Sequence, residues 1–517
     1  MRFLTACVLS GIAALALTVQ AQGRTFDLVN AGIDDIQAAV DAGALTYERL
    51  VRMYLDRIDA FDRRGPQLRA IIATNPRAVE MARALDAERK QRGRRSRLHG
   101  IPIAVKDNID AAGMPTTGGN ATFAGAYPPR DATVVQKLRE AGAIIIAKTN
   151  LDELASASRG LSTVGGQILN PYDLTRNPGG SSGGSAVAVA SGFAPISLGT
   201  ETGFSIRSPA SNTGVAGFVP TRGLISRSGV MPLSFTQDRV GVHAHSVDDI
   251  ATVVQTIRGY DDGDAATEPS LTVPQAPLRP LGEARNMRVG VLIEMFRQGE
   301  RFAAFNTVVL AQRAALARAG MVVIDDLSTG SNAIALMPDL RLNSFELRTA
   351  FDAYLLRRGP NSPVKTFAEL VAGGKYLRGG SLERRIQETM QIGDLKTNAD
   401  YQQRLKTQAS LRAQLVALID KHQLAALMYP VKSLPAPPIG SSDDGERDNN
   451  LSAITGLPAT VLPAAFDTTG LPIAVEFLGA PFSEARLLAV AAAYQKVNPV
   501  RVVPPSTPAR PGDVVRY

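Results

Sequence analysis

Hydrophobic residues follow a helical period at the start of this chain and a strand-like pattern further on. Between residues 32 and 92 the apolar positions recur every three to four residues, which predicts two or three amphipathic helices. Beyond residue 100, short apolar runs at 101–105 and 143–147 predict buried strands, and the segment 134–141 between them predicts a helix. Short buried strands that alternate with helices indicate an α/β fold, in which helices cover both faces of a central sheet.

The same alternation resumes after a proline-rich stretch at residues 261–283, which we expect to form a surface linker. Residues 287–293 and 321–324 predict strands on either side of a helix at 302–319. Residues 332–398 are polar and mostly helical in pattern, so we expect them to form an insertion that caps the core. The pattern thus predicts a helical N-terminal region at 22–92, a main domain at 93–500 that carries this insertion, and a C-terminal tail at 501–517.

The first 21 residues have the features of a secretory signal peptide. Arg2 precedes an apolar stretch at 3–19, and the small-residue pattern that ends at Ala21 suits signal peptidase. We therefore expect export to the periplasm or the medium, although so short a stretch could also remain as a membrane anchor. Cys7, the only cysteine, lies in this segment, so the mature chain would have neither a disulfide nor a thiolate nucleophile.

Composition excludes some classes of partner. The 517 residues are 45% hydrophobic and 20% charged, as in ordinary globular proteins, and the net charge of +8 is small for this length. The basic run at 89–97 is interrupted by Gly93 and is interpreted as a solvated loop. No nucleic-acid-binding motif accompanies it, so we expect no nucleic-acid partner.

The segment at 179–185, Gly-Gly-Ser-Ser-Gly-Gly-Ser, is the most informative part of the sequence. Its glycines let the backbone approach a ligand, and a helix-forming run follows at 186–190. A phosphate loop would need Lys and then Ser or Thr after the last glycine, and this chain lacks them. A nucleophile elbow fits around Ser181 or Ser182, but the preceding residues 173–178 are polar rather than a buried strand.

The chain offers little material for a histidine base or a metal site. Its four histidines occur in segments that do not resemble a triad loop, namely His99, His243, His245 and His422. No pair of histidines at ligand spacing on a helix and no cysteine cluster exists, so we expect neither a metal nor a cofactor. A lysine that is removed from water could supply the base instead.

Two further segments supply a serine and such a lysine. Residues 199–210, Gly-Thr-Glu-Thr-Gly-Phe-Ser-Ile-Arg-Ser-Pro-Ala, follow an apolar run at 194–198, so Ser205 comes just past a strand end. Backbone N–H groups in such a loop can form an oxyanion hole. Residues 100–108, Gly-Ile-Pro-Ile-Ala-Val-Lys-Asp-Asn, place Lys106 at the end of a buried strand, where burial disfavours its charged form.

Together these three segments resemble the amidase signature family, and the separation of Ser181 and Ser205 is also that of the family. The resemblance covers roughly residues 30 to 495 and implies one α/β/α domain around a mixed sheet. It implies that Lys106 is a general base, that Ser181 follows a cis peptide and relays a proton, and that Ser205 is the nucleophile.

The resemblance also implies the parts that support this triad. Backbone N–H groups of four consecutive residues would form the oxyanion hole, namely Thr202, Gly203, Phe204 and Ser205. Thr200 and Arg207 match positions that support the site, and for Arg207 a structural role is favoured. Phe204 departs from the family, which commonly has glycine there, so its ring either meets the substrate or packs in the core.

The sequence therefore predicts an amidase that cleaves linear, aryl or peptide amides through an acyl-enzyme. Three alternatives stay open: a glutamine amidotransferase component of the A type, a membrane-anchored lipid amidase, and a noncatalytic binding protein of the same fold. The expected partner is a small-molecule or peptide amide, with a membrane only if the N-terminal segment is uncleaved. The sequence does not distinguish a monomer from a homodimer.

Overall fold

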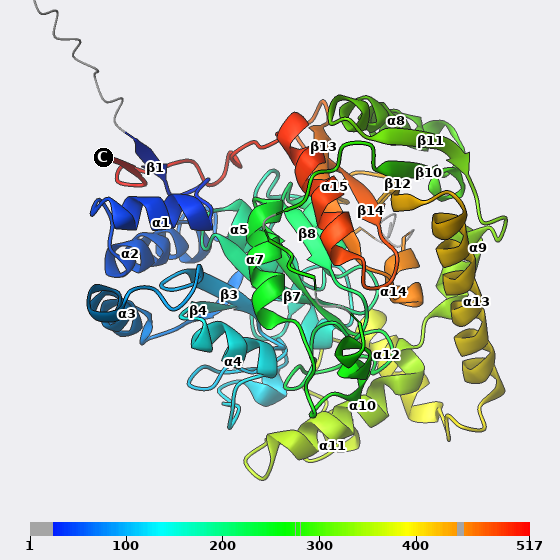
Figure 1. The fold of residues 1–517 in the computed structure, drawn as a ribbon. Coiled ribbons are helices and arrows are strands. Elements are labelled where there is room, and N and C mark those ends of the chain that lie inside the picture. The colour runs from blue at the N-terminus through cyan, green and yellow to red at the C-terminus, as the bar shows by residue number, and fades with distance from the viewer. Residues whose placement is uncertain (1–23, 274–275, 280, 442–448) are drawn as a thin grey trace, which may run out of the picture.

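An eleven-stranded mixed sheet forms the centre of the structure (Figure 1). The computed structural model describes residues 24–273, 276–279, 281–441 and 449–517. Neighbouring strands of the sheet follow the order β11-β10-β12-β14-β13-β8-β9-β7-β3-β4-β2. The strands are β2 (Ile71–Thr74), β3 (Pro102–Lys106), β4 (Ile144–Thr149), β7 (Ile196–Glu201), β8 (Ala216–Val219), β9 (Arg239–Ala244), β10 (Arg288–Leu292), β11 (Val322–Leu327), β12 (Leu424–Pro430), β13 (Ala459–Phe466) and β14 (Pro472–Leu478).

Helices cover both faces of this sheet, as the alternation of strands and helices predicts. On one face, α5 and α6 pack together against the central strands; on the other, α4, α7, α15 and α8 form a continuous layer. Every residue of α5 is buried, which explains its purely small and apolar sequence. The helices are α1 (Ile33–Asp41), α2 (Tyr47–Arg57), α3 (Ala78–Arg92), α4 (Thr133–Glu140), α5 (Gly183–Ala190), α6 (Arg207–Asn212), α7 (Val247–Ile257), α8 (Glu300–Arg318), α9 (Ala333–Leu336), α10 (Asn343–Arg358), α11 (Phe367–Gly373), α12 (Ser381–Gln391), α13 (Ala399–Lys421), α14 (Leu451–Thr455) and α15 (Glu484–Val497).

The pairing of β3 with its neighbours brings the candidate site together. β3 lies between β4 and β7 and runs parallel to both, so the three strands end at the same edge of the sheet. Lys106 is the last residue of β3, and Glu201 is the last residue of β7. The loop that follows β7 therefore begins beside Lys106, although nearly a hundred residues separate the two in sequence.

The N-terminal region at 22–92 contributes a strand to the central sheet that the hydrophobic pattern does not predict. Residues 22–92 contain the expected helices α1, α2 and α3, but they also contribute β2, which pairs with β4 at the edge of the central sheet. This strand has only four residues and no buried face, so its hydrophobic pattern is too short to identify. The tail forms β15 (Val514–Arg516), which pairs with β1 (Thr25–Asp27).

Residues 332–398 contain α9 to α12; α10 packs against α11 and α12, whereas α9 lies apart from these three helices and contacts the turn at Ile293–Met295 after β10 (Figure 1). Leu347 and Phe351 of α10 belong to a separate hydrophobic cluster, which also includes Leu154 and Leu233 from loops at the strand ends. The insertion thus rests on the loops that surround the site.

The expected signal peptide, residues 1–21, lies outside the described residues. Within the described ranges, no helix combines the length and apolar character needed to cross a bilayer. The basic run at 89–97 forms the end of α3 and the loop after it, and its arginines are engaged by acids: Arg89 and Arg94 pair with Asp41, and Arg95 pairs with Glu88.

Candidate active site

Lys106 is wholly buried and makes three polar contacts. Its Nζ lies 2.7 Å from Ser181 Oγ, 2.8 Å from Thr200 Oγ1 and 3.2 Å from the Thr200 carbonyl oxygen. Asn108 Nδ2 donates to the same Thr200 hydroxyl at 3.0 Å. The ends of β3 and β7 thus enclose the amine and direct it toward Ser181.

Burial lowers the pKa of Lys106 to about 7, and the nearby carboxylates of Asp152, Asp238 and Glu201 only partly oppose this effect. The amine is therefore neutral in a large fraction of molecules near neutral pH. A neutral amine has two N–H groups and one lone pair. The two oxygen atoms of Thr200 can accept from the N–H groups, which leaves the lone pair for the Ser181 hydroxyl.

The serines of the loop at 179–185 make different contacts. The peptide bond between Gly180 and Ser181 is cis, as the family resemblance implies, and the Asp152 N–H donates to the Ser181 carbonyl at 3.1 Å. A side chain at Gly180 would come within 1.8 Å of an Asp152 oxygen, so only glycine fits. Ser182 Oγ donates to the Thr200 carbonyl at 2.9 Å, which ties Ser182 to β7 and leaves Ser181 facing Lys106.

Ser205 lies in the loop after β7 and lines a narrow cleft. Its carbonyl accepts a hydrogen bond from the Ser182 N–H at 3.1 Å, which joins the two serine-bearing loops. Among the described residues, Ser205 Oγ has no hydrogen-bond partner, and Ser181 contacts Lys106 rather than Ser205. The Ser205 hydroxyl is thus accessible from the cleft, while the Lys106–Ser181 pair lies behind it.

The loop before Ser205 presents free N–H groups. Within the described part of the chain, the backbone N–H groups of Thr202, Gly203, Phe204 and Ser205 donate to no acceptor. Thr202 Oγ1 donates to Asp238 Oδ1 at 2.5 Å, which fixes the start of the loop. Unused N–H groups beside an accessible hydroxyl are what a developing oxyanion requires.

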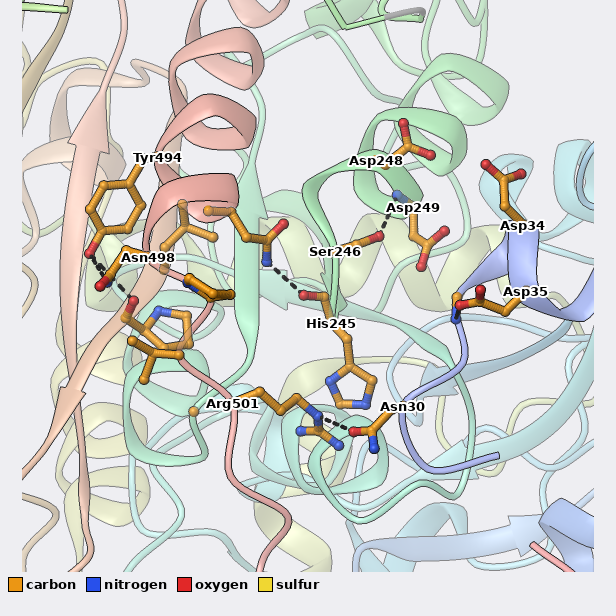
Figure 2. Close-up of a pocket in the computed structure, with 17 residues that line it drawn as sticks. Asn30, Asp34, Asp35, His245, Ser246, Asp248, Asp249, Tyr494, Asn498 and Arg501 are labelled. Carbon is orange, nitrogen blue, oxygen red and sulfur yellow. Dashed lines mark hydrogen bonds between the residues drawn. The ribbon is translucent and has the colours of Figure 1, made fainter. Parts of the chain in front are cut away.

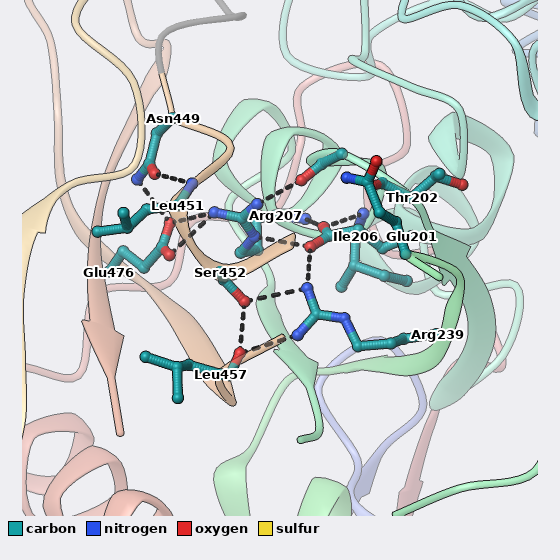
Figure 3. A network of polar contacts seen from close by, with 12 residues as sticks. Glu201, Thr202, Ile206, Arg207, Arg239, Asn449, Leu451, Ser452, Leu457 and Glu476 are labelled. Carbon is teal, nitrogen blue, oxygen red and sulfur yellow. Dashed lines mark hydrogen bonds and ion pairs between the residues drawn. The ribbon is translucent and has the colours of Figure 1, made fainter. Parts of the chain in front are cut away.

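A buried ion-pair network holds this loop from below (Figure 3). Arg207 pairs with Glu201 and Glu476, each at 2.9 Å, and its Nη2 donates to the Gly203 carbonyl at 2.5 Å. Arg239 pairs with Glu201 at 3.1 Å. Burial alone would lower the pKa of Arg207, but the two carboxylates raise it above its ordinary value. Arg207 therefore supports the loop without lining the cleft.

Phe204 is half-buried, lines the cleft and belongs to none of the hydrophobic core clusters. The opposite wall comes from several distant segments. It comprises Ser156 and Ser158 from the loop after β4, Leu233, Asn450, and the residues Arg341, Asn343 and Arg385 that lie at or within the helical insertion.

Several residues that line or support the cleft are not predicted from the sequence. Glu476 carries a recognisable signal in the sequence, because it is the single acidic residue in the otherwise apolar strand β14. Arg341 and Arg385 had no such signal: Arg385 lies on α12, where polar residues are usually solvent-exposed, and Arg341 lies in the short connection before α10. His243 is the histidine that approaches the loop, with Nε2 3.0 Å from the Ile206 carbonyl, and burial lowers its pKa to about 4. In the described residues, no group of acids, histidines or cysteines could hold a metal ion.

Comparison with known proteins assigns this site to a family. The profile of the amidase family matches residues 49–488. The chain is 35% identical to the A-type subunit of glutamyl-tRNA(Gln) amidotransferase from Deinococcus radiodurans, over 90% of this chain and 97% of that protein. It is 31% identical to a probable amidase of Arabidopsis thaliana, over 93% and 92% of the two chains.

A solved structure supports the same family assignment. The structure of peptide amidase from Stenotrophomonas maltophilia has a TM-score of 0.83 and 35% sequence identity, and the match covers 92% of this chain and 98% of that one. It shares the mixed sheet flanked by helices on which the site is built. This chain is an amide-hydrolysing enzyme that belongs to the amidase signature family.

Proposed function

We propose that this enzyme hydrolyses linear, aryl or peptide amides of carboxylic acids, with Ser205 as nucleophile, Ser181 as proton relay and Lys106 as general base. The observation that carries this proposal is the 2.7 Å contact between the buried Lys106 amine and Ser181 Oγ. Because the lysine pKa is lowered to about 7, the amine can accept a proton through this contact at neutral pH.

The reaction would proceed in two steps. In the first, Lys106 takes the Ser181 proton while Ser181 takes that of Ser205, whose Oγ attacks the amide carbonyl. The N–H groups of residues 202–205 receive the negative charge of the tetrahedral intermediate. The relay then reverses and protonates the departing amine, which is too basic to leave unprotonated. In the second step a water molecule, activated by the same relay, hydrolyses the acyl-enzyme.

Labelling with a fluorophosphonate probe tests this assignment. Ser205→Ala should abolish labelling and amide hydrolysis, and mass spectrometry should find the adduct of the wild-type enzyme on Ser205. Ser182→Ala is the matched control, because Ser182 bonds to β7 and should remain dispensable for labelling. An adduct on Ser182, or a His243→Ala variant as inactive as Lys106→Ala, would overturn the triad.

Of the alternatives, a component of a glutamine amidotransferase has support from the similarity to the glutamyl-tRNA(Gln) amidotransferase of Deinococcus radiodurans. We favour a free amidase because residues 1–21 have the pattern of a secretory signal. Hydrolysis of a peptide amide or an anilide by the isolated chain supports the amidase. Activity confined to glutamine, and only in the presence of other subunits, would favour the amidotransferase.

Export itself forms part of the proposal, to the periplasm or the medium, with cleavage after Ala21. The mature protein from its native host should begin near Gln22 when its N-terminus is sequenced. Intact Met1 in a soluble cytosolic fraction would refute export.

A further inference from the structure

A second cavity, of about 580 Å³, shares no lining residue with the cleft at Ser205 (Figure 2). β7 and β9 are antiparallel, with Glu201 opposite Arg239 at the end that carries the catalytic loop and Ile196 opposite Ala244 at the other end. His245, which follows β9, lines the cavity, so the cavity opens at the end of the sheet opposite to the active site. Its size is typical of sites for small molecules.

One wall of this cavity contains an arginine without an acid partner. Arg501 Nε donates to Asn30 at 2.8 Å, and Nη2 donates to the Val29 carbonyl at 3.1 Å. The third nitrogen, Nη1, is buried and has no acceptor, and within the described ranges Arg501 forms no ion pair. A buried guanidinium of this kind is complementary to a carboxylate, which it can bind through two parallel hydrogen bonds.

The facing wall contains a carboxylate with one unpaired oxygen. Asp249 is only 2% exposed; its Oδ1 accepts from the Ile33 N–H at 3.0 Å, whereas Oδ2 has no partner. A side chain at Gly32 would come within 2.8 Å of Oδ2, so glycine at this position avoids a close contact with the buried oxygen. An unpaired buried carboxylate oxygen favours an ammonium or N–H donor.

Neighbouring charges do not compensate Asp249. Asp34 and Asp248, which also line the cavity, are engaged by Arg97 and Arg279. Asp35 accepts from the Gly32 N–H and, among the described residues, has no basic partner, so it adds negative charge on the same side as Asp249. The cavity thus has an acidic side around Asp249 and Asp35 and a basic side at Arg501.

The remaining wall suits a compact, partly apolar molecule. Leu462, Pro463 and Val500 supply apolar surface. His245 lies between the two charged sides in Figure 2, and the backbones of Val29 and Val189 lie close to its ring. Burial and the charge of Arg501 keep the pKa of His245 well below its ordinary value, so the neutral ring offers one donor and one acceptor.

We propose that this cavity is a second ligand site that binds a small zwitterion of the amino-acid or dipeptide class. Its carboxylate would lie at Arg501, its ammonium group at Asp249, and its apolar side chain against Leu462 and Val500. The site is separate from the catalytic cleft, and its occupation does not depend on the mechanism proposed for Ser205.

Isothermal titration calorimetry of the full chain with the dipeptide glycyl-L-leucine tests the proposal. We expect one site with a dissociation constant in the millimolar range or tighter. Glycyl-L-leucinamide, which lacks the carboxylate, and N-acetylglycyl-L-leucine, which lacks the ammonium group, should each bind at least about tenfold more weakly, since each loses a charge-assisted hydrogen bond. All three ligands are titrated into the Ser205→Ala variant as well, so that hydrolysis of the amide at the catalytic cleft cannot supply the dipeptide. These ligand changes test both charges without altering the fold.

Arg501→Gln should weaken glycyl-L-leucine at least about tenfold, and Asp249→Asn should do the same if the variant folds. Arg510→Gln is the matched control, because Arg510 lies in the same tail but donates to the Asp56 carbonyl and does not line the cavity. Absence of binding at millimolar dipeptide, equal affinity for the amide and acetyl analogues, or affinity unchanged in a folded Arg501→Gln variant would each overturn the proposal.

Discussion

Replacing Lys106 by methionine provides a direct test of how far burial lowers the pKa of its amine. Methionine fills a similar volume without a charge, so the variant loses the cost of burying an ionisable group. A shift of the lysine pKa from 10.5 to about 7 corresponds to about 5 kcal/mol between the protonated and neutral forms. The three polar contacts of Nζ offset this cost by about 1 kcal/mol each.

Together, the pKa shift and the three polar contacts make the difference in stability between Lys106→Met and the wild type change sign with pH. Between pH 7 and 10.5 the unfolded chain keeps Lys106 protonated while the folded chain has released that proton, so wild-type stability rises with pH by about 1.4 kcal/mol per unit. Lys106→Met lacks this dependence. At pH 7 the variant should therefore be more stable than the wild type by about 2 kcal/mol, and near pH 9 it should be less stable by about 1 kcal/mol.

Urea unfolding of both proteins at pH 7, 8 and 9 measures this difference, because all other titrating groups are shared and cancel in the comparison. The control is Lys137→Met, a lysine that is only half-buried and donates to the backbone carbonyl of Arg258. Its difference from the wild type should change much less with pH. A difference between wild type and Lys106→Met that stays constant from pH 7 to 9 would refute the lowered lysine pKa.

Three further predictions concern activity and the support of the loop. The wild-type kcat/KM for an anilide should rise with pH through a midpoint of about 7, as Lys106 loses its proton, and a fall over this range would contradict a neutral lysine base. Phe204→Gly should raise kcat/KM for bulky amides relative to small ones, because the ring lines the cleft; an unchanged ratio would mean that the ring does not meet the substrate. Glu476→Gln should cost about 3 kcal/mol of stability in urea unfolding and lower kcat, since Arg207 loses a buried partner while it holds the Gly203 carbonyl, and full activity would show that the loop needs no such support.

The parts of the site that sequence analysis predicts are those with local signals. Lys106 directly ends an apolar run, so both its strand and its burial follow from a few neighbouring residues. The glycines around Ser181 and the N–H groups before Ser205 likewise belong to short, continuous segments. Such motifs can be recognised from the sequence because the backbone conformation that they need depends on residues close in sequence.

The walls of the cleft depend instead on tertiary packing. Arg385 reaches the cleft because α12 packs against α10, and it donates to the Ser156 carbonyl at 2.6 Å, a contact between residues more than two hundred positions apart. β2 is not predicted for a related reason, since its place at the sheet edge depends on pairing with β4 rather than on its own short pattern. Substrate preference is therefore the property that the sequence predicts least.

The network beneath the loop explains how a site with such a lysine can tolerate buried charge. Two arginines, Arg207 and Arg239, face two glutamates, Glu201 and Glu476, so the cluster has balanced charge. Burial lowers the pKa of Arg239 to about 10, which still leaves it cationic at neutral pH. A net negative cluster at this position would raise the pKa of Lys106 and repel the oxyanion, because Coulomb interactions are strong where water is excluded. Balanced charge limits both effects, so the network can fix the Gly203 carbonyl in place.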